Sequence, residues 1–352
     1  MERTLRTGLL GLGLGLAACG SSGNENDDSD TDTTTSTGTD GDADGDADGD
    51  ADSDTDTDTD SDTDTDTTCT VFPSDNPWNQ DISQAQVHPN SDAFIASIGA
   101  DGFVHPDFGT VWDGAPIGIP FVEVTSATPK VAVAFDYADE SDPGPYPIPD
   151  NAPIEGGPSS DGDRHILMVD YGSCTLYELY WAWPPGEGEN PYTDRWYAGS
   201  GAIFDLSSND LRPEGWTSAD AAGLPIFPGL VTYHEAVEEG VIDHALRVTV
   251  SATQRGYIHP ATHYASDSTD SNLPPMGLRL RMKGAFDCSG YSQEAQVVCA
   301  ALKTYGMFVA DNGSDWYISG APDDRWSDDN LGDLKQIPGS AFEAVYTGDI
   351  IY

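Results

Sequence analysis

The chain has 352 residues, with 61 acidic and 14 basic side chains and a formal net charge of −47. A charge of this sign excludes nucleic acid as a partner, because binding to phosphates needs a basic surface. It also disfavours acidic polysaccharides, unless divalent ions or a local arginine cluster offset the repulsion. The acidic residues are unevenly distributed, and their distribution divides the chain into three parts.

The first part, residues 1–18, has the pattern of an export signal. Two arginines precede a Leu- and Gly-rich run, residues 7–16, that is too short to span a bilayer. Residues 16–19, Leu-Ala-Ala-Cys, resemble the lipobox of bacterial lipoproteins, which implies lipidation of Cys19 and a membrane anchor. Gly20 stands where an aspartate would mark inner-membrane retention, so the outer membrane or cell surface is favoured. An ordinary secretory signal is the alternative.

The second part, residues 19–68, is an acidic low-complexity tether that begins at the lipidated cysteine. Residues 21–68 include 19 acidic side chains, no Lys or Arg, and few apolar side chains other than Ala. Such a segment cannot bury enough apolar surface to offset the entropy of folding, so we expect a disordered, self-repelling spacer.

The third part, residues 69–352, is predicted to be a single secreted globular domain, because no repeat or low-complexity run marks a second boundary. It contains 41 acidic and 12 basic residues. Its four cysteines predict two disulfides in an oxidising compartment. Three pairings are open. The short intervening loop favours Cys288 with Cys299, which leaves Cys69 with Cys174.

Short β-branched or aromatic runs bounded by Gly, Pro and Asp predict strands throughout the domain. The clearest runs are residues 117–124, 130–137, 164–170, 175–183, 245–252 and 277–283. One helix is clear, over about 293–305, where apolar residues recur at helical spacing after Ser292. Shorter helical pieces are expected at 218–222 and 234–239. The domain is therefore predicted to be mainly β, of the β-sandwich or jelly-roll type, with long Gly/Pro-rich loops.

The runs 164–170 and 175–183 are close enough in sequence to form a hairpin. A loop of two or four residues pairs Leu167 with Leu176 and His165 with Glu178. A carboxylate beside an imidazole raises the His pKa and fixes its tautomer, as a general base or a metal ligand requires. His165 and Glu178 are therefore the candidate catalytic pair. The alternative is a polar pair that only pins the hairpin.

Residues near this hairpin are candidates for substrate binding. Sugars stack on aromatic rings in clefts that also carry a few polar groups. Tyr180, Trp181 and Trp196 are such rings, and Arg164 is a neighbouring polar group. Packing in the core is the alternative for each ring.

Two patterns point to metal ions. His259 and His263 have i,i+4 spacing and, together with His234 and His244, are candidate metal ligands, but no motif supplies a further placed ligand. The acidic loop 136–142 offers carboxylate and carbonyl oxygens for calcium, the candidate cofactor. Ordinary surface histidines and a solvated acidic loop are the alternatives.

Several loop motifs resemble those of a family of secreted bacterial proteins. They are residues 162–165, 196–202, 211–225, 305–306 and 310–318. The resemblance covers most of residues 75–345. Because the family is uncharacterised, the resemblance implies an exported, single-domain protein and assigns no catalytic residue.

These patterns favour a cell-surface lipoprotein whose β-rich domain binds an extracellular carbohydrate and, in one interpretation, cleaves it at His165 and Glu178. A non-catalytic envelope protein, for binding or for structure, is the second interpretation. A metal-dependent hydrolase is the third, and it requires the histidines to converge in space. The sequence alone leaves open whether the protein is an enzyme.

Overall fold

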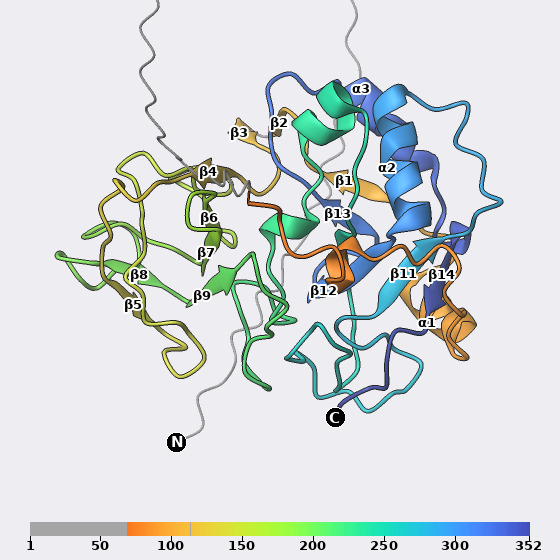
Figure 1. The fold of residues 1–352 in the computed structure, drawn as a ribbon, viewed down its shortest axis with the longest axis horizontal. Helices are drawn as coiled ribbons and strands as arrows, with labels where there is room; N and C mark the ends of the chain where they lie inside the picture. Colours follow the sequence, from red (N-terminus) through yellow and green to blue (C-terminus); the bar gives the residue numbers. More distant parts are fainter. Residues whose placement is uncertain (1–68, 113) are drawn as a thin grey trace, which may run out of the picture. The chain divides into compact units, whose positions relative to one another are not determined.

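A computed structural model describes residues 69–112 and 114–352, which form four β-sheets with few helices (Figure 1). The predicted signal, the lipidation site at Cys19 and the tether lie outside these residues. None of the sheets closes into a barrel within the described part of the chain. No helix there combines the length and the apolar character needed to cross a bilayer.

The largest sheet has six strands in the order β1-β13-β10-β12-β11-β14 and mixes parallel and antiparallel pairs. Its strands are β1 (His105–Asp107), β10 (Leu246–Val250), β11 (Arg279–Met282), β12 (Met307–Asn312), β13 (Tyr317–Ser319) and β14 (Phe342–Val345). The apolar side chains of β10 alternate along the strand, so that one of its faces joins the main core and the other carries Arg247.

A second sheet has four strands in the order β4-β6-β7-β9. Its strands are β4 (Phe121–Glu123), β6 (Ile166–Asp170), β7 (Thr175–Tyr180) and β9 (Ser200–Asp205). Two smaller sheets pair β2 (Val111–Trp112) with β3 (Ala115–Pro116), and β5 (Val133–Phe135) with β8 (Trp196–Ala198). Each of the six predicted strand runs contains a strand, shorter than predicted because the flanking residues turn into loops.

Helices are short apart from two. The α-helices are α1 (Ser91–Ile98), α2 (Gln293–Thr304) and α3 (Asp328–Leu331). The 3₁₀ helices are η1 (Pro77–Asn79), η2 (Phe227–Gly229), η4 (Gly332–Gln336) and η5 (Gly339–Ala341), and η3 (His234–Glu239) is a single π-helical segment. The helix predicted at 293–305 is confirmed as α2, which packs beside β11 (Figure 1). The Ser292 hydroxyl donates to the Asn330 carbonyl instead of capping α2.

The predicted hairpin exists, but its predicted register is wrong by two residues. β6 and β7 are antiparallel, with Leu167 opposite Glu178 and not opposite Leu176. The turn comes later than predicted because Asp170 accepts hydrogen bonds from the amides of residues 172 and 173, and Cys174 is left-handed and bonded to Cys69. A slip of two residues preserves the faces, so His165 and Glu178 still share one face as diagonal neighbours.

Residues 218–230, which we name the bridging segment, connect the two larger sheets. The predicted helix at 218–222 is wrong, because Asp220 and Ser218 fold this stretch into turns through their own hydrogen bonds. Glu178 of β7 accepts bonds from the amides of Ile226 and Phe227, and Arg247 of β10 binds Asp220. The bridging segment thus places side chains from both sheets around one point.

Both disulfides pair as the loop lengths favour. Cys69 is bonded to Cys174, at a sequence separation of 105 residues, and Cys288 is bonded to Cys299, at a separation of 11 residues. The first joins the start of the described domain to the β6–β7 turn. The second fastens α2 to the loop that follows β11.

Candidate functional site

His165 is fixed as a cation next to the bridging segment. Its Nδ1 donates to Glu155 at 2.6 Å and its Nε2 donates to the Ala219 carbonyl at 3.1 Å. Because both partners are acceptors, both ring nitrogens carry protons. Burial lowers the pKa of His165, but the charge and hydrogen bond of Glu155 outweigh it and raise the pKa to about 9. An imidazole that is protonated at neutral pH is a positive charge in the site and not a general base.

Glu155, which the sequence did not single out, is the partner of this cation. Its amide donates to the His165 carbonyl, and the His165 amide donates back to its carboxylate, so the loop around it is strapped to the start of β6. Burial raises the pKa of Glu155, but His165 outweighs burial and holds it below the ordinary value. Its side chain remains 25% exposed, so it reaches solvent.

Glu178 is fully buried, and its carboxylate is hydrogen-bonded to the main chain of the bridging segment. Its two carboxylate oxygens accept from the amides of Ile226 and Phe227, at 2.9 to 3.0 Å, at the start of η2. Burial outweighs these bonds and raises the pKa of Glu178 to about 7. No substrate reaches a side chain with this burial, so Glu178 positions the segment and touches no ligand.

The polar face of the six-stranded sheet adds five polar groups to the site. The strand register places Asp107 opposite Ser319 and Thr249 opposite Asp311. Paired residues share a face, and Arg247 lies two residues before Thr249, so all of these groups lie on one face. Arg247 donates to Ser319 at 2.6 Å and binds Asp220 through two nitrogens, at 2.8 and 3.3 Å.

Asp311 is the most strongly perturbed carboxyl of this face. It is half-buried. Burial, and after it the charge of Asp220, raises its pKa to about 8, although the charge of Arg247 acts to lower it. Burial also raises the pKa of Asp220, but the two bonds from Arg247 oppose this and favour its ionised form, whereas Asp311 has no such bonds. Asp311 is therefore the carboxyl of this face whose protonated form is favoured near neutral pH.

Two exposed carboxylates complete what we name the carboxylate cluster: Asp107, Glu155, Asp163 and Asp311. The surrounding protein and then the charge of Glu155 raise the pKa of Asp107, although this residue as a whole is exposed. Asp163 is close enough for its charge to raise the pKa of both His165 and Asp311. The cluster thus combines a neutral acid with carboxylates in contact with water.

The predicted substrate-binding residues separate into two groups. Tyr180 lies at the cluster, with its ring 5.7 Å from that of His165, and burial followed by the charge of Asp163 raises its pKa to about 12. Trp181 stacks edge-on to Trp183 and Tyr197, and Trp196 packs on the smaller core, both half-buried.

Arg164, the polar group predicted to bind substrate, is buried, and its backbone has a left-handed conformation. It stacks on Trp183 at 3.7 Å and donates to the carbonyls of Ala182, Pro158 and Ser160. Because main-chain acceptors already use its donors, we leave Arg164 out of the proposed site. It fixes the loop that follows Glu155.

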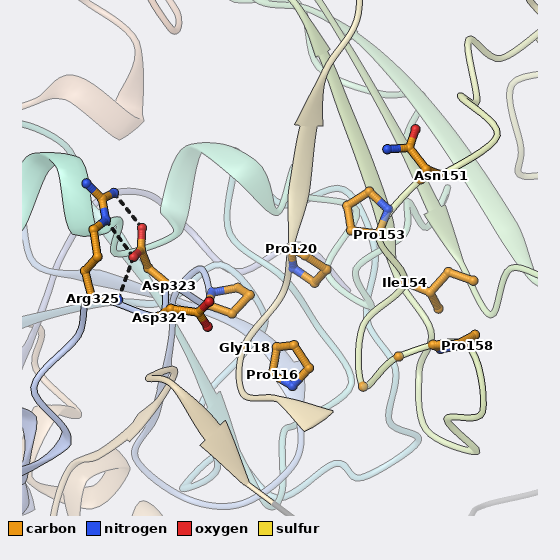
Figure 2. A pocket seen from close by; sticks show the side chains of 14 residues that line it. Pro116, Gly118, Pro120, Asn151, Pro153, Ile154, Pro158, Asp323, Asp324 and Arg325 are labelled. Atoms are coloured by element: carbon orange, nitrogen blue, oxygen red, sulfur yellow. Dashed lines mark hydrogen bonds and ion pairs between the residues drawn. The ribbon is translucent and has the colours of Figure 1, made fainter. Parts of the chain in front are cut away.

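A cavity of about 790 Å³ lies beside this loop (Figure 2). Ile154 and Gly156, on either side of Glu155 in sequence, are among its lining residues. Figure 2 shows the loop on one side and Asp323 and Arg325 on the other, joined to each other by an ion pair of 2.7 Å. Prolines supply much of the remaining wall, so the cavity offers rigid apolar surface with charges at one end.

The candidate metal ligands do not converge. Three of these histidines pair with glutamates: His234 with Glu238 and Glu239, His244 with Glu235, and His259 with Glu214. His263 is hydrogen-bonded to the Ala221 carbonyl. In residues 69–112 and 114–352, no three His, Cys, Asp or Glu side chains come together to hold a metal ion.

The acidic loop 136–142 has its own protein partners. Arg212 binds Asp142 at 2.6 Å and the Glu140 carbonyl at 2.9 Å, and the Tyr197 hydroxyl donates to Asp136. The guanidinium thus supplies the positive charge that the sequence analysis assigned to calcium.

Comparison with protein-family models, curated proteins and solved structures finds no match to this chain. The resemblance to a family of secreted bacterial proteins therefore stays a prediction. Sequence reasoning missed Glu155, Asp107, Asp163, Arg247 and Asp311 as site residues. Asp220 and Asp311 do lie within the motifs that carry the resemblance, which is the signal that could have found them.

Proposed function

We propose that this protein is a lipoprotein of the outer membrane or cell surface whose domain binds an extracellular carbohydrate and cleaves it at the carboxylate cluster. One feature carries the proposal: the half-buried Asp311 carboxyl, whose pKa burial and the charge of Asp220 raise to about 8, lies near the exposed carboxylate of Asp163. Paired carboxyls with separated pKa values are the usual apparatus of glycoside hydrolysis. The export signal, Cys19 and the acidic tether support a location outside the cell, with the domain held off the membrane by its anchor.

The cluster supplies an acid and a base for hydrolysis. Asp311 gives its proton to the glycosidic oxygen as the bond to the anomeric carbon breaks. Asp163 accepts a proton from water, and the hydroxide attacks the anomeric carbon. Solvent then returns the proton from Asp163 to Asp311. One proton leaves Asp311, one reaches Asp163, and one water molecule is consumed, so the reaction balances.

The buried groups position the reacting carboxyls. Arg247 holds Asp220, and the resulting anion keeps Asp311 protonated. His165 holds the Glu155 loop against β6. Tyr180 offers a ring beside the cluster on which a sugar can stack. Trp181 and Trp196 are half-buried rings away from the cluster that a longer glycan could also contact.

A non-catalytic binding or envelope-structural protein is the second candidate. The burial of His165 and Glu178 favours it, because a pair with all its bonds made inside the protein pins the fold and does not react. In this case the half-exposed rings and the proline-lined cavity bind a glycan that stays intact.

We also propose that the two larger sheets form a sandwich with the bridging segment between them. Leu167 and Leu176 of one sheet and Leu246 and Val248 of the other belong to one continuous core, which supports this arrangement.

The experiment is an assay of the full chain, purified in detergent, against a panel of neutral, acidic and amino-sugar polysaccharides. Retention and release of new reducing ends are both measured, with EDTA or added calcium. Wild-type protein is expected to release product from a neutral polymer. Asp311→Asn lowers the rate at least about 100-fold, since general acids contribute this much. The exposed Asp329→Asn control keeps the wild-type rate.

The other outcomes separate the remaining candidates. Retention without product supports the non-catalytic candidate. Product that EDTA abolishes and metal restores supports a metal-dependent hydrolase. If no polymer is retained and none yields product, a carbohydrate function is contradicted.

A further inference from the structure

A second cavity, of about 800 Å³, lies where the β6–β7 turn meets η2 and η3. None of its lining residues belongs to the carboxylate cluster. Its walls come from the end of β4, the turn residue Tyr171, both short helices and the chain next to Cys69. Its volume lies within the range of cavities that hold small organic ligands.

Aromatic rings form one part of this wall. Phe121 and Phe227 meet edge to face at 4.9 Å, and Tyr171 and Tyr305 add phenol rings. The faces of such rings carry negative electrostatic potential, so they attract cations within about 6 Å. The rings also bury the methylene groups of a flexible ligand.

Carboxylates form the other part, and two of them lack a partner. Glu235 is bonded to His244 at 3.0 Å, and Glu239 is bonded to His234 at 3.2 Å. The side-chain carboxylates of the exposed residues Glu123 and Asp243 have no hydrogen bond or ion pair with any described residue, and no Lys or Arg lines the cavity. Two carboxylates without a bonded partner therefore line a space large enough for a ligand.

The charge of the cavity restricts what it can take. An anion would be repelled, and the acidic segment 21–68 has the same sign as the cavity. A metal ion is disfavoured, because no three acidic or histidine side chains of the described chain converge on one point. An ammonium group fits, since its three donors match separate carboxylate and phenol oxygens.

We propose that this cavity binds a small organic cation with two or more primary amines, of the linear polyamine class. One ammonium group pairs with Glu123 near Tyr171, and a second pairs with Asp243 near Tyr305. The methylene chain between them packs on Phe121 and Phe227. This site is independent of the carboxylate cluster and does not rest on carbohydrate cleavage.

Titration calorimetry of the full chain with spermidine, in buffer containing magnesium, tests the site. Magnesium occupies the loose counterion sites that any acidic surface offers. Wild-type protein is expected to bind spermidine saturably at one site. Glu123→Gln combined with Asp243→Asn weakens binding at least about tenfold, because two charge-assisted bonds are lost.

A matched control changes the net charge by the same amount. Asp150→Asn combined with Asp161→Asn removes two exposed carboxylates that have no contact with the cavity, and binding changes less than about twofold. Diacetylspermidine, which keeps the length but loses both terminal charges, binds at least about tenfold more weakly. Should the site variant not fold, Tyr171→Leu, which removes a half-exposed ring, serves in its place. The proposal is overturned by absent saturation, by equal weakening in the site and control variants, or by full binding of the diacetylated probe.

Discussion

His165 shows how hydrogen bonding decides the role of a residue that looks catalytic in sequence. A histidine beside a carboxylate is usually considered a general base, but here both ring nitrogens face acceptors. The bonds fix the protonated form, so the side chain stabilises the fold and sets the charge of the site. The neighbouring carboxyls carry like charges, which raise the pKa of Asp107 and Asp311 toward the neutral range in which acid–base chemistry works.

His165→Gln tests this role through the pH dependence of stability. The folded pKa of about 9 lies above the ordinary 6.5, so the stabilisation is full below pH 6.5 and is lost as the pH rises through 9. Urea unfolding is expected to show the variant less stable by about 3 kcal/mol at pH 6, a difference that shrinks as the pH reaches 9.5. His259→Gln, on the surface, is the control. A difference that stays constant with pH would show that His165 is neutral in the fold.

The bridging segment shows what sequence reasoning could and could not predict. Strand positions and α2 were predictable, because apolar periodicity and caps are local signals. The faces of His165 and Glu178 were also predictable, since any even slip preserves them. The register itself was not, because the bonds of Asp170 and the disulfide at Cys174 decide where the turn begins. The groups Glu155, Asp220 and Asp311 come from two loops and from β12, which lie far apart in the sequence and which no local pattern connects.

Gly223→Ala tests the bridging segment as an element. Gly223 is left-handed, at φ +74°, and a Cβ there would meet the Thr262 hydroxyl at 2.2 Å and the Trp216 carbonyl at 2.7 Å. The substitution is expected to cost about 1–3 kcal/mol of unfolding free energy in urea. Gly284→Ala, where a Cβ meets nothing within 4 Å, is the matched control and changes stability by less than about 0.5 kcal/mol. Equal effects at both positions would mean that the segment has room to adjust.

At the scale of the whole molecule, two features agree with the proposed location outside the cell. The described domain carries a large excess of acidic residues, and two disulfides close loops of very different length. The charge favours neutral or cationic ligands, in agreement with both proposed sites. The longer disulfide ties the start of the described domain to the turn between β6 and β7 of the four-stranded sheet.

Removing each disulfide separately tests their contributions. In the chain-entropy model, replacing Cys69 and Cys174 by Ser costs about 5 kcal/mol, because the closed loop is long. Replacing Cys288 and Cys299 by Ser costs about 3 kcal/mol, because the loop is short. Guanidinium unfolding of the two variants measures both losses of unfolding free energy and shows which is larger. A larger loss for the shorter loop would show that native contacts, and not loop entropy, dominate.

The most direct measurement of the central claim is the pH dependence of product release from the polysaccharide that the wild-type protein cleaves. Asp311 must be protonated to act, and burial and Asp220 raise its pKa to about 8. The rate is therefore expected to fall about tenfold per pH unit above pH 8, and Asp311→Asn should be nearly inactive at every pH. A rate that stays constant up to pH 10, or full activity in Asp311→Asn, would contradict a proton-donating role for Asp311.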